Sequence, residues 1–360
     1  MGLAIRRACL KEDRQELLEV FKRNFGEFGE NHEERYDYQC KLNPAGEGWT
    51  WLLYDRSSGS TVGTTSLFRR KMYVNGRQLL AGQVMFFAVD AGYRSLGPAL
   101  MLQRVTFDPV DHGEVAFCYD CPPHDEGMST FVRLGMHPNC VMTRYVLPLR
   151  SDEYLRKSLG KGAWTKPVIA TANLLLRMQR SRHDPPGLEI SEFRGDFGEE
   201  FSHLDEVVSS SGVIRGRRSS EVLTWLYRQF PPSAQRTRNS LNDEFRTLVA
   251  RRAGELVGFV VFRDQTDNLI AITDLFGAQL ESAGIPLIEA VIGVAKRNKM
   301  HGVYAYCVGG SELSRVLESA GFRPRERAAR VVAYERTNGR ASHYLTPGLC
   351  WPFSQVELMR

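Results

Sequence analysis

Residues 86–102 read FFAVDAGYRSLGPALML, the most informative stretch of the sequence. An apolar segment, Phe86–Val89, enters a short loop that contains Arg94 and Gly97. A helix is expected to begin at Pro98, whose missing amide hydrogen suits the first helical turn. Exposed amides at a helix N-terminus, with the helix dipole behind them, bind anions. Gly97 lets a phosphate approach the backbone and Arg94 adds positive charge, so the stretch predicts a cradle for a pyrophosphate.

The segments around this stretch alternate between the strand and helix periods. The elements that we expect in the first part of the chain are strands over 3–7, 49–54, 61–73, 79–90, 114–120 and 140–147, and helices over 13–24, 98–107 and 126–134. Asn75-Gly76 favours a type I′ hairpin turn, because both residues accept a positive φ. This order of strand, helix, antiparallel meander and strand–helix–strand predicts a mixed α/β or α+β layered domain.

The chain repeats itself once. Segments 60–65 and 255–260 match, as do 132–136 and 318–322, and the aromatic-rich segment 35–44 resembles 222–231. Three matches in the same order, 186–195 residues apart, argue for a duplicated domain. The expected division is an N-terminal domain over 1–150, a connector over 151–186, a second domain over 187–340 and a C-terminal extension over 341–360.

Residues 89–99, VDAGYRSLGPA, resemble the acyl-CoA signature of the GNAT superfamily of N-acyltransferases. In that signature a strand is followed by Arg or Gln, two residues, Gly, one residue, Gly or Ala, and a helix. Arg94, Gly97 and Ala99 stand at the matching positions, and the segment ending in Leu134-Gly135-Met136 resembles a later helix of the family. The resemblance covers nearly the whole chain and implies two tandem GNAT-like mixed-sheet domains joined by a basic connector helix.

The resemblance also implies roles for these residues. The thioester of acetyl-CoA, or of another acyl-CoA, would lie where two parallel strands separate, and the Val89 amide would donate to its carbonyl as an amine attacks. The residues that would hold the pyrophosphate of CoA are Arg94, Ser95, Leu96, Gly97, Pro98 and Ala99. Pro98 has no amide hydrogen, so one phosphate contact of the signature is missing.

The tyrosine that serves many GNAT proteins as general acid is also missing. Its position, four residues before the glycine that ends the later helix, holds Phe131, and Leu317 in the second copy. Tyr119 and Asp120 are the nearest substitutes along the sequence, and Asp120 could deprotonate an ammonium directly or through water. The alternative is that Asp120 caps the following turn. His124 is a second candidate base or a solvated loop residue.

The second copy lacks the phosphate loop. Thr273–Leu280 has neither the Arg nor the second small residue at the required spacing. We therefore expect this copy to be degenerate for CoA and to close the acceptor site or stabilise the first copy. Asp274 could touch an acceptor amine, but we expect a surface residue.

The amino-acid composition and the distribution of charge limit the classes of protein to which the chain could belong. Apolar residues make up 42% and charged residues 25%, as in a soluble globular protein. The net charge of +5 is concentrated in residues 151–187, which hold seven basic and three acidic residues. The connector is therefore expected either to pack across both domains or to lie on an anionic membrane or an acidic partner. The rest of the chain is nearly neutral, so no nucleic-acid partner is expected.

Neither a membrane span nor a signal peptide is predicted, because the uncharged runs fall short of about 20 residues. The seven scattered cysteines indicate reduced thiols in a cytoplasmic protein, which the basic connector could bring to the membrane surface as a peripheral protein. Cys118 and Cys121 form a Cys-x-x-Cys without a second pair, so no metal is expected. The sequence thus favours an acyl-CoA-dependent N-acyltransferase, by default an N-acetyltransferase, acting on a small-molecule or polymer amine. The alternative is a non-catalytic CoA-binding or scaffold protein.

Overall fold

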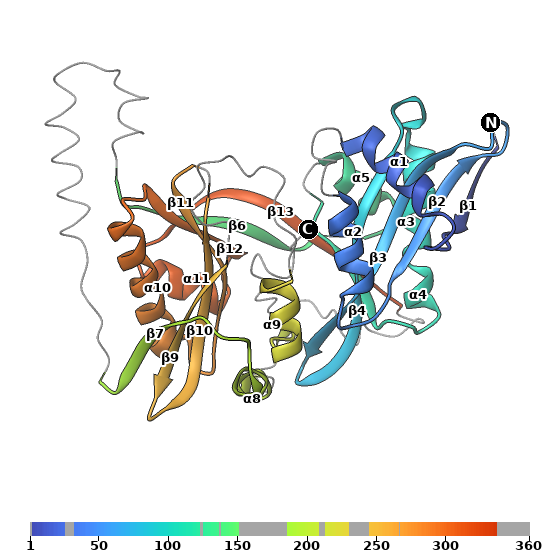
Figure 1. The fold of residues 1–360 in the computed structure, drawn as a ribbon. Coiled ribbons are helices and arrows are strands. Elements are labelled where there is room, and N and C mark those ends of the chain that lie inside the picture. Colours follow the sequence, from blue (N-terminus) through green and yellow to red (C-terminus); the bar gives the residue numbers. More distant parts are fainter. Residues whose placement is uncertain are drawn as a thin grey trace, which may run out of the picture.

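A computed structural model describes residues 2–25, 32–122, 125–136, 138–150, 186–208, 213–229, 245–265 and 267–336. Its elements fall into two lobes that lie side by side (Figure 1). The connector 151–186, apart from its last residue, and the C-terminal extension 341–360 lie outside the described residues, so the expectations for them remain predictions.

The first lobe contains the predicted strand–helix–meander order. Its elements are β1 (Leu3–Arg7), α1 (Arg14–Phe25), α2 (His32–Lys41), β2 (Trp49–Asp55), β3 (Thr61–Val74), β4 (Arg77–Val89), the 3₁₀ turn η2 (Ala91–Tyr93), α3 (Leu96–Val105), α4 (Asp108–Asp111), β5 (Phe117–Asp120), α5 (Asp125–Arg133) and β6 (Pro138–Pro148). Asn75 and Gly76 both have positive φ, 50° and 75°, which confirms the predicted hairpin turn between β3 and β4.

The second lobe follows the same order. Its elements are β7 (Leu188–Phe193), α8 (Glu199–Val208), β8 (Ile214–Gly216), α9 (Ser220–Tyr227), β9 (Arg246–Arg252), β10 (Glu255–Asp264), β11 (Leu269–Gly277), α10 (Leu280–Arg297), β12 (Gly302–Val308), α11 (Glu312–Ser319) and β13 (Arg323–Glu335). The registers repeat as well. Gly63 of β3 pairs with Val89, the last residue of β4, and Gly258 of β10 pairs with Gly277, the last residue of β11. This correspondence supports the proposed duplication.

Among the described residues the strands form one continuous 13-stranded sheet. The last strands of the two lobes change places: β13 lies between β5 and β6, and β6 pairs with β12 of the second lobe. Figure 1 shows β6 and β13 running between the lobes. The sequence analysis did not anticipate this exchange, which makes the sheet of each lobe depend on a strand from the other.

Helices cover both faces of the sheet in the first lobe. Leu17 and Phe21 of α1 pack with Phe68 and Met85 on one face. Val84, the neighbour of Met85, packs on the opposite face with residues of α4 and α5. The alternation follows from the period of two along a strand. It gives the sheet an α1–α2 face and an α3–α5 face.

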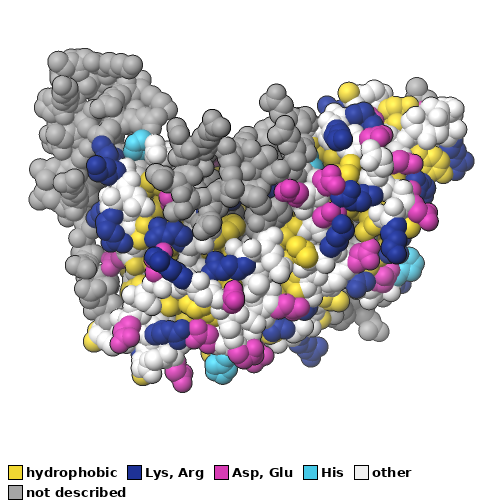
Figure 2. Space-filling model, in the orientation of Figure 1, with side chains coloured by type: hydrophobic (Ala, Val, Ile, Leu, Met, Phe, Trp, Pro, Cys, Tyr) yellow, Lys and Arg dark blue, Asp and Glu magenta, His cyan; other side chains and the backbone are white. Residues whose placement is uncertain are grey.

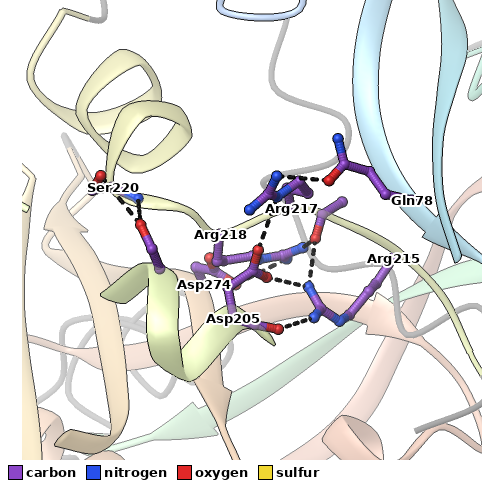
Figure 3. A network of polar contacts seen from close by, with 9 residues as sticks. Gln78, Asp205, Arg215, Arg217, Arg218, Ser220 and Asp274 are labelled. Atoms are coloured by element: carbon purple, nitrogen blue, oxygen red, sulfur yellow. Dashed lines mark hydrogen bonds and ion pairs between the residues drawn. The ribbon is translucent and has the colours of Figure 1, made fainter. Parts of the chain in front are cut away.

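A buried polar network joins the lobes (Figure 3). Strand β8 pairs with β3 of the first lobe. Arg215 of β8 and Arg217, which follows that strand, share the carboxylate of Asp205, a fully buried residue of α8, at 2.5 and 3.2 Å. Arg217 also donates to Gln78 Oε1 of β4 at 2.8 Å. Burial lowers the pKa of Arg215, and Asp205 opposes that shift by stabilising the charged guanidinium.

Asp205→Asn is therefore expected to lower the free energy of unfolding by about 1–3 kcal/mol, because it leaves buried arginines without their full counter-charge. Urea denaturation followed by circular dichroism measures this change. The matched control is Glu189→Gln, at an exposed position of β7, which should leave the free energy of unfolding within about 0.5 kcal/mol of the wild type. Equal midpoints for the two variants would show that the network contributes nothing to stability.

Candidate active site

Strands β4 and β5 run parallel and separate soon after they meet. Within the described residues their ladder consists of the pairs Gly82–Cys118 and Gln83–Tyr119. Strand β5 ends at Asp120, whereas β4 continues to Val89. Beyond Gln83, the edge of β4 that faces β5 therefore has no strand partner in the described part of the chain. A peptide-like chain could pair with this edge, which borders the gap where the resemblance implied that the thioester would lie.

A β-bulge lies in the middle of this free edge. The register between β3 and β4 shifts between Thr64 and Ser66, so that one residue of β3 faces two residues of β4, Phe86 and Phe87. Phe86 has φ 52°, a backbone conformation that is rare for a bulky residue. Residues in such strained conformations are found more often at functional sites. Its ring stacks on Phe21 of α1 at 5.1 Å, which holds the bulge in place. The sequence analysis missed this feature because neither residue is a glycine.

Val89, the predicted oxyanion donor, is oriented by the ladder with β3. The Asp90 amide donates to the Val62 carbonyl at 2.8 Å, a bond that flanks the Gly63–Val89 pair. That pair is therefore of the non-hydrogen-bonded type, in which the amide of each residue points away from the other strand. The Val89 amide thus faces the side of β4 where β5 has separated. This orientation supports the predicted role.

The loop after β4 leads to an exposed helix N-terminus. Ser95 is the N-cap of α3, and Ser95, Leu96 and Gly97 are all exposed. A Cβ added at Gly97 would meet no atom within 4 Å, so the space in front of the backbone is open. The first amides of a helix have no intrahelical partner, and an anion can bind them.

One detail of the prediction was wrong. The helix begins at Leu96 rather than at Pro98, which is its third residue and is buried. Pro98 still removes an amide that would have no helical partner. Ala99 is partly buried, and its amide makes a long 3.4 Å bond to the Ser95 carbonyl. The amides left for a phosphate are therefore those of Ser95, Leu96 and Gly97.

Side-chain contacts hold the loop against its surroundings. Arg94 donates through Nε to the Val89 carbonyl at 3.0 Å and through Nη2 to Asn24 Oδ1 at 3.3 Å, while its side chain stays exposed. Asp90 accepts hydrogen bonds from Arg23 and Asn24 of α1. These contacts fix the loop before any ligand arrives, and they place the charge of Arg94 beside the end of β4.

Tyr119 and Asp120 point to opposite faces of the sheet, since they are neighbours on a strand. Tyr119 is buried and lies with Arg70 on the α1–α2 face. Asp120 is 8% exposed, and its Oδ1 accepts a hydrogen bond from the Cys121 amide at 2.7 Å. That bond matches the alternative in which Asp120 caps the turn. The two residues therefore do not form one pair of proton-transfer groups. His124 lies outside the described residues.

The positions of the missing tyrosines are buried. Phe131 is 1% exposed and Leu317 is fully buried, so neither faces a ligand. In the second lobe β11 ends at Gly277 and α10 begins at Leu280, which leaves no room for a phosphate loop, as expected. The expectation of a surface Asp274 was wrong. Its carboxylate is 1% exposed and pairs with Arg218 at 3.2 Å (Figure 3).

Three further features of the described residues concern metal binding, surface charge and membrane insertion. Cys118 and Cys121 are buried free thiols, and no group of three His, Cys, Asp or Glu residues in the described ranges could hold a metal ion. On the face shown in Figure 2, basic and acidic side chains are interspersed over the described residues. No helix within the described ranges is long and apolar enough to cross a membrane.

Comparison with known structures identifies the fold. A probable N-acyltransferase from Enterococcus faecalis superposes with a TM-score of 0.63 at 10% identity, over 93% of this chain and 72% of its own. A GCN5-related N-acetyltransferase from Anabaena variabilis gives 0.62 at 13% identity, over 92% and 72%. The N-myristoyltransferase of Saccharomyces cerevisiae, solved with bound myristoyl-CoA, gives 0.56 at 12% identity, over 92% and 79%.

These likenesses confirm the expected fold class: the chain has the fold of the GCN5-related N-acetyltransferases (GNAT fold), and the similarity extends over nearly all of it. No family model matches the sequence. No curated protein matches it closely enough to count as a relative.

Proposed function

We propose that this chain is an acyl-CoA-dependent N-acyltransferase that transfers an acyl group, by default acetyl, to an amine. The observation that carries the proposal is the continuous surface formed by the free edge of β4 and the exposed N-terminus of α3. This surface offers unpaired strand amides for a pantetheine arm and helix amides for a pyrophosphate. The open space at Gly97 fits a phosphate close to the backbone.

In this proposal the Val89 amide donates to the thioester oxygen as negative charge develops on it. The amine attacks the carbonyl carbon, the tetrahedral intermediate collapses, and the C–S bond breaks to release the thiolate of CoA. The attacking nitrogen loses a proton, and the thiolate gains one directly or from solvent. Tyr119 on the α1–α2 face and Asp120 on the opposite face are the candidates for these transfers. Binding both reactants in the same gap makes the attack nearly unimolecular.

A thiol-release assay tests the activity. The full chain is mixed with acetyl-CoA and a panel of amines, including sugar amines, amino acids and peptides, and free CoA is followed with a thiol reagent. Release that depends on one amine, with the acetylated amine found by mass spectrometry, is the expected result. Saturable binding of acetyl-CoA without release for any amine would contradict the enzyme and favour the non-catalytic CoA-binding alternative.

The connector is a separate proposal. Its seven basic residues between positions 151 and 187 would place it against an anionic membrane or an acidic partner. The likeness to an N-myristoyltransferase makes a long-chain acyl donor a variant of the same activity, since that protein was solved with myristoyl-CoA. Running the assay with myristoyl-CoA beside acetyl-CoA measures the preferred donor.

A further inference from the structure

A cavity of about 40 Å³ lies where the two lobes meet, next to the last paired residues of β4 and β5. It is bounded by the loop Asn43–Ala45, by Arg70 of β3, by Tyr119 of β5, and by the segment from Gly216 to Leu226. The polar network of Figure 3 fixes this last wall, because Arg217 and Arg218 belong to it.

Arg70 contacts neutral groups. Its Nε donates to Gln83 Oε1 and its Nη2 to Gln39 Oε1, both at 2.8 Å, and its Nη1 donates to the Arg69 carbonyl at 3.0 Å. The guanidinium also lies 4.9 Å from the ring centroid of Trp225 in α9. No carboxylate forms an ion pair with Arg70 in the part of the chain that the structure describes.

The surroundings of the cavity have an excess of positive charge. Four of its lining residues are cationic, and none of its lining residues is acidic. Three of the cations have a carboxylate partner: Lys71 pairs with Glu221, Arg217 with Asp205 and Arg218 with Asp274. Arg70 is the exception among these four.

Burial lowers the pKa of Arg70, and the nearby Tyr119 and Tyr38 oppose that shift. Burial also lowers the pKa of Arg215, but there the carboxylate of Asp205 opposes it. A guanidinium away from water is stabilised most by an anion. Four of the five N–H groups of Arg70 already donate within the protein, the fourth to Met85 Sδ at 3.7 Å. An anion in the cavity would therefore meet the charge of Arg70 and its one remaining N–H.

The enclosed part of the cavity is small. About 10–15 Å³ of such volume holds one water, so its roughly 40 Å³ accept a group of a few heavy atoms such as a carboxylate. The cavity is partly open to solvent, which leaves space for the rest of the acceptor.

The position of the cavity links it to the proposed reaction. Gln83, which binds Arg70, pairs with Tyr119 at the rung where β4 and β5 separate. Arg70, Gln83 and Tyr119 thus come from three neighbouring strands and lie on the α1–α2 face, beside the gap expected to hold the thioester. Arg70 itself pairs with Ala81 and reaches Gln83 diagonally. An acceptor with its anionic end at Arg70 would extend its other end toward that gap.

We infer that this cavity binds the carboxylate of the acceptor, so that the substrate class is amines that carry a carboxylate a few bonds away, as amino acids do. The inference rests on the proposed function for its link to acyl transfer. Arg70 is then the residue that sets acceptor specificity. Trp225 supports its guanidinium, and Tyr119 both lines the cavity and belongs to the last residue pair of the β4–β5 ladder.

Matched acceptors test the inference. The full chain is assayed with acetyl-CoA and with glycine, β-alanine and γ-aminobutyrate, each beside its own amide. At least one acid should be preferred over its amide by about ten-fold or more in kcat/KM, and Arg70→Gln should abolish that preference mainly through KM. Arg70→Lys should retain part of it. The control is Arg77→Gln, at an exposed residue of the same hairpin, which should leave the preference unchanged.

Equal use of acids and amides by the wild type, or an unchanged preference in a folded Arg70→Gln variant, would overturn the inference while leaving the acyltransferase standing. Thermal unfolding of each variant establishes that it is folded. If Arg70→Gln does not fold, a reduced preference in Arg70→Lys supports the inference, and an unchanged preference in that variant would overturn it.

A titration without CoA separates the two proposals. Acetate, and not acetamide, should shift one arginine Nε–H resonance in the ¹⁵N spectrum of the full chain, and that resonance should be absent from Arg70→Gln. Absence of any acetate-dependent shift would overturn the carboxylate site. A shift together with no thiol release from any amine would support the anion site and contradict the proposed acyltransferase.

Discussion

Gly97→Trp is expected to weaken binding of acetyl-CoA and CoA by about 100-fold or more. The reason is steric and electrostatic. Gly97 is exposed at the second position of α3, with nothing in front of its backbone, and an indole there would occupy the place of the pyrophosphate. Losing two or three charge-assisted hydrogen bonds, each of about 1.5–3 kcal/mol, accounts for an effect of that size. Calorimetric titration of the full chain with each ligand measures it.

The matched control is Gly198→Trp. Gly198 is also exposed, its φ is also outside the left-handed region, and a Cβ there also meets no atom within 4 Å, but it precedes α8 in the second lobe. We expect both variants to fold with thermal midpoints near the wild type and the control to bind acetyl-CoA normally. Normal binding by a folded Gly97→Trp would place the CoA site elsewhere.

Val89→Pro is expected to lower kcat by about 10²–10³-fold while changing the affinity for acetyl-CoA much less. Proline removes the amide hydrogen proposed to donate to the thioester oxygen, and loss of one oxyanion donor has effects of that size. The ladder should survive, because the Val89 amide points away from β3 and the bond that closes the strand pair comes from Asp90. Single-turnover kinetics and calorimetry together separate the chemical step from binding.

The control for this variant is Val89→Ala, which trims the same side chain but keeps the amide. Its kcat is expected to fall far less than that of Val89→Pro. Equal losses in the two variants would attribute the effect to packing around α3, where the Val89 side chain contacts Leu102 and its neighbours. The oxyanion role would then be wrong.

The features that the sequence predicted correctly depend on residues close together in the chain. Asn75-Gly76 forms its turn because those two residues accept positive φ, and the phosphate loop lies between a strand and a helix because residues 86–102 carry both periods in succession. The sequence repeat that led us to propose a duplication has a local physical basis, because the matched glycines Gly63 and Gly258 meet the same steric limit. At both glycines an added Cβ would meet a backbone carbonyl oxygen of the neighbouring strand, at 2.9 and 3.1 Å.

The features that depend on distant contacts were not predictable. The exchange of β6 and β13 depends on which neighbouring strand each one pairs with. The alternation of apolar and polar residues along a strand predicts which face is buried, but it does not identify the neighbouring strand. The bulge at Phe86 depends on ring packing against α1. Asp274 was expected at the surface because its partner Arg218 lies 56 residues earlier, and sequence spacing carries no signal for such a pair. Arg70 was overlooked for the same reason, since Trp225 and Tyr119 reach it from other parts of the chain.

A crystal structure of the full chain with acetyl-CoA would show where the cofactor binds. We expect the pyrophosphate on the amides of Ser95, Leu96 and Gly97, the pantetheine arm along the free edge of β4, and the thioester oxygen within hydrogen-bonding distance of the Val89 amide. Acetyl-CoA bound away from the β4–α3 loop, for example at the N-terminus of α10, would contradict this expectation.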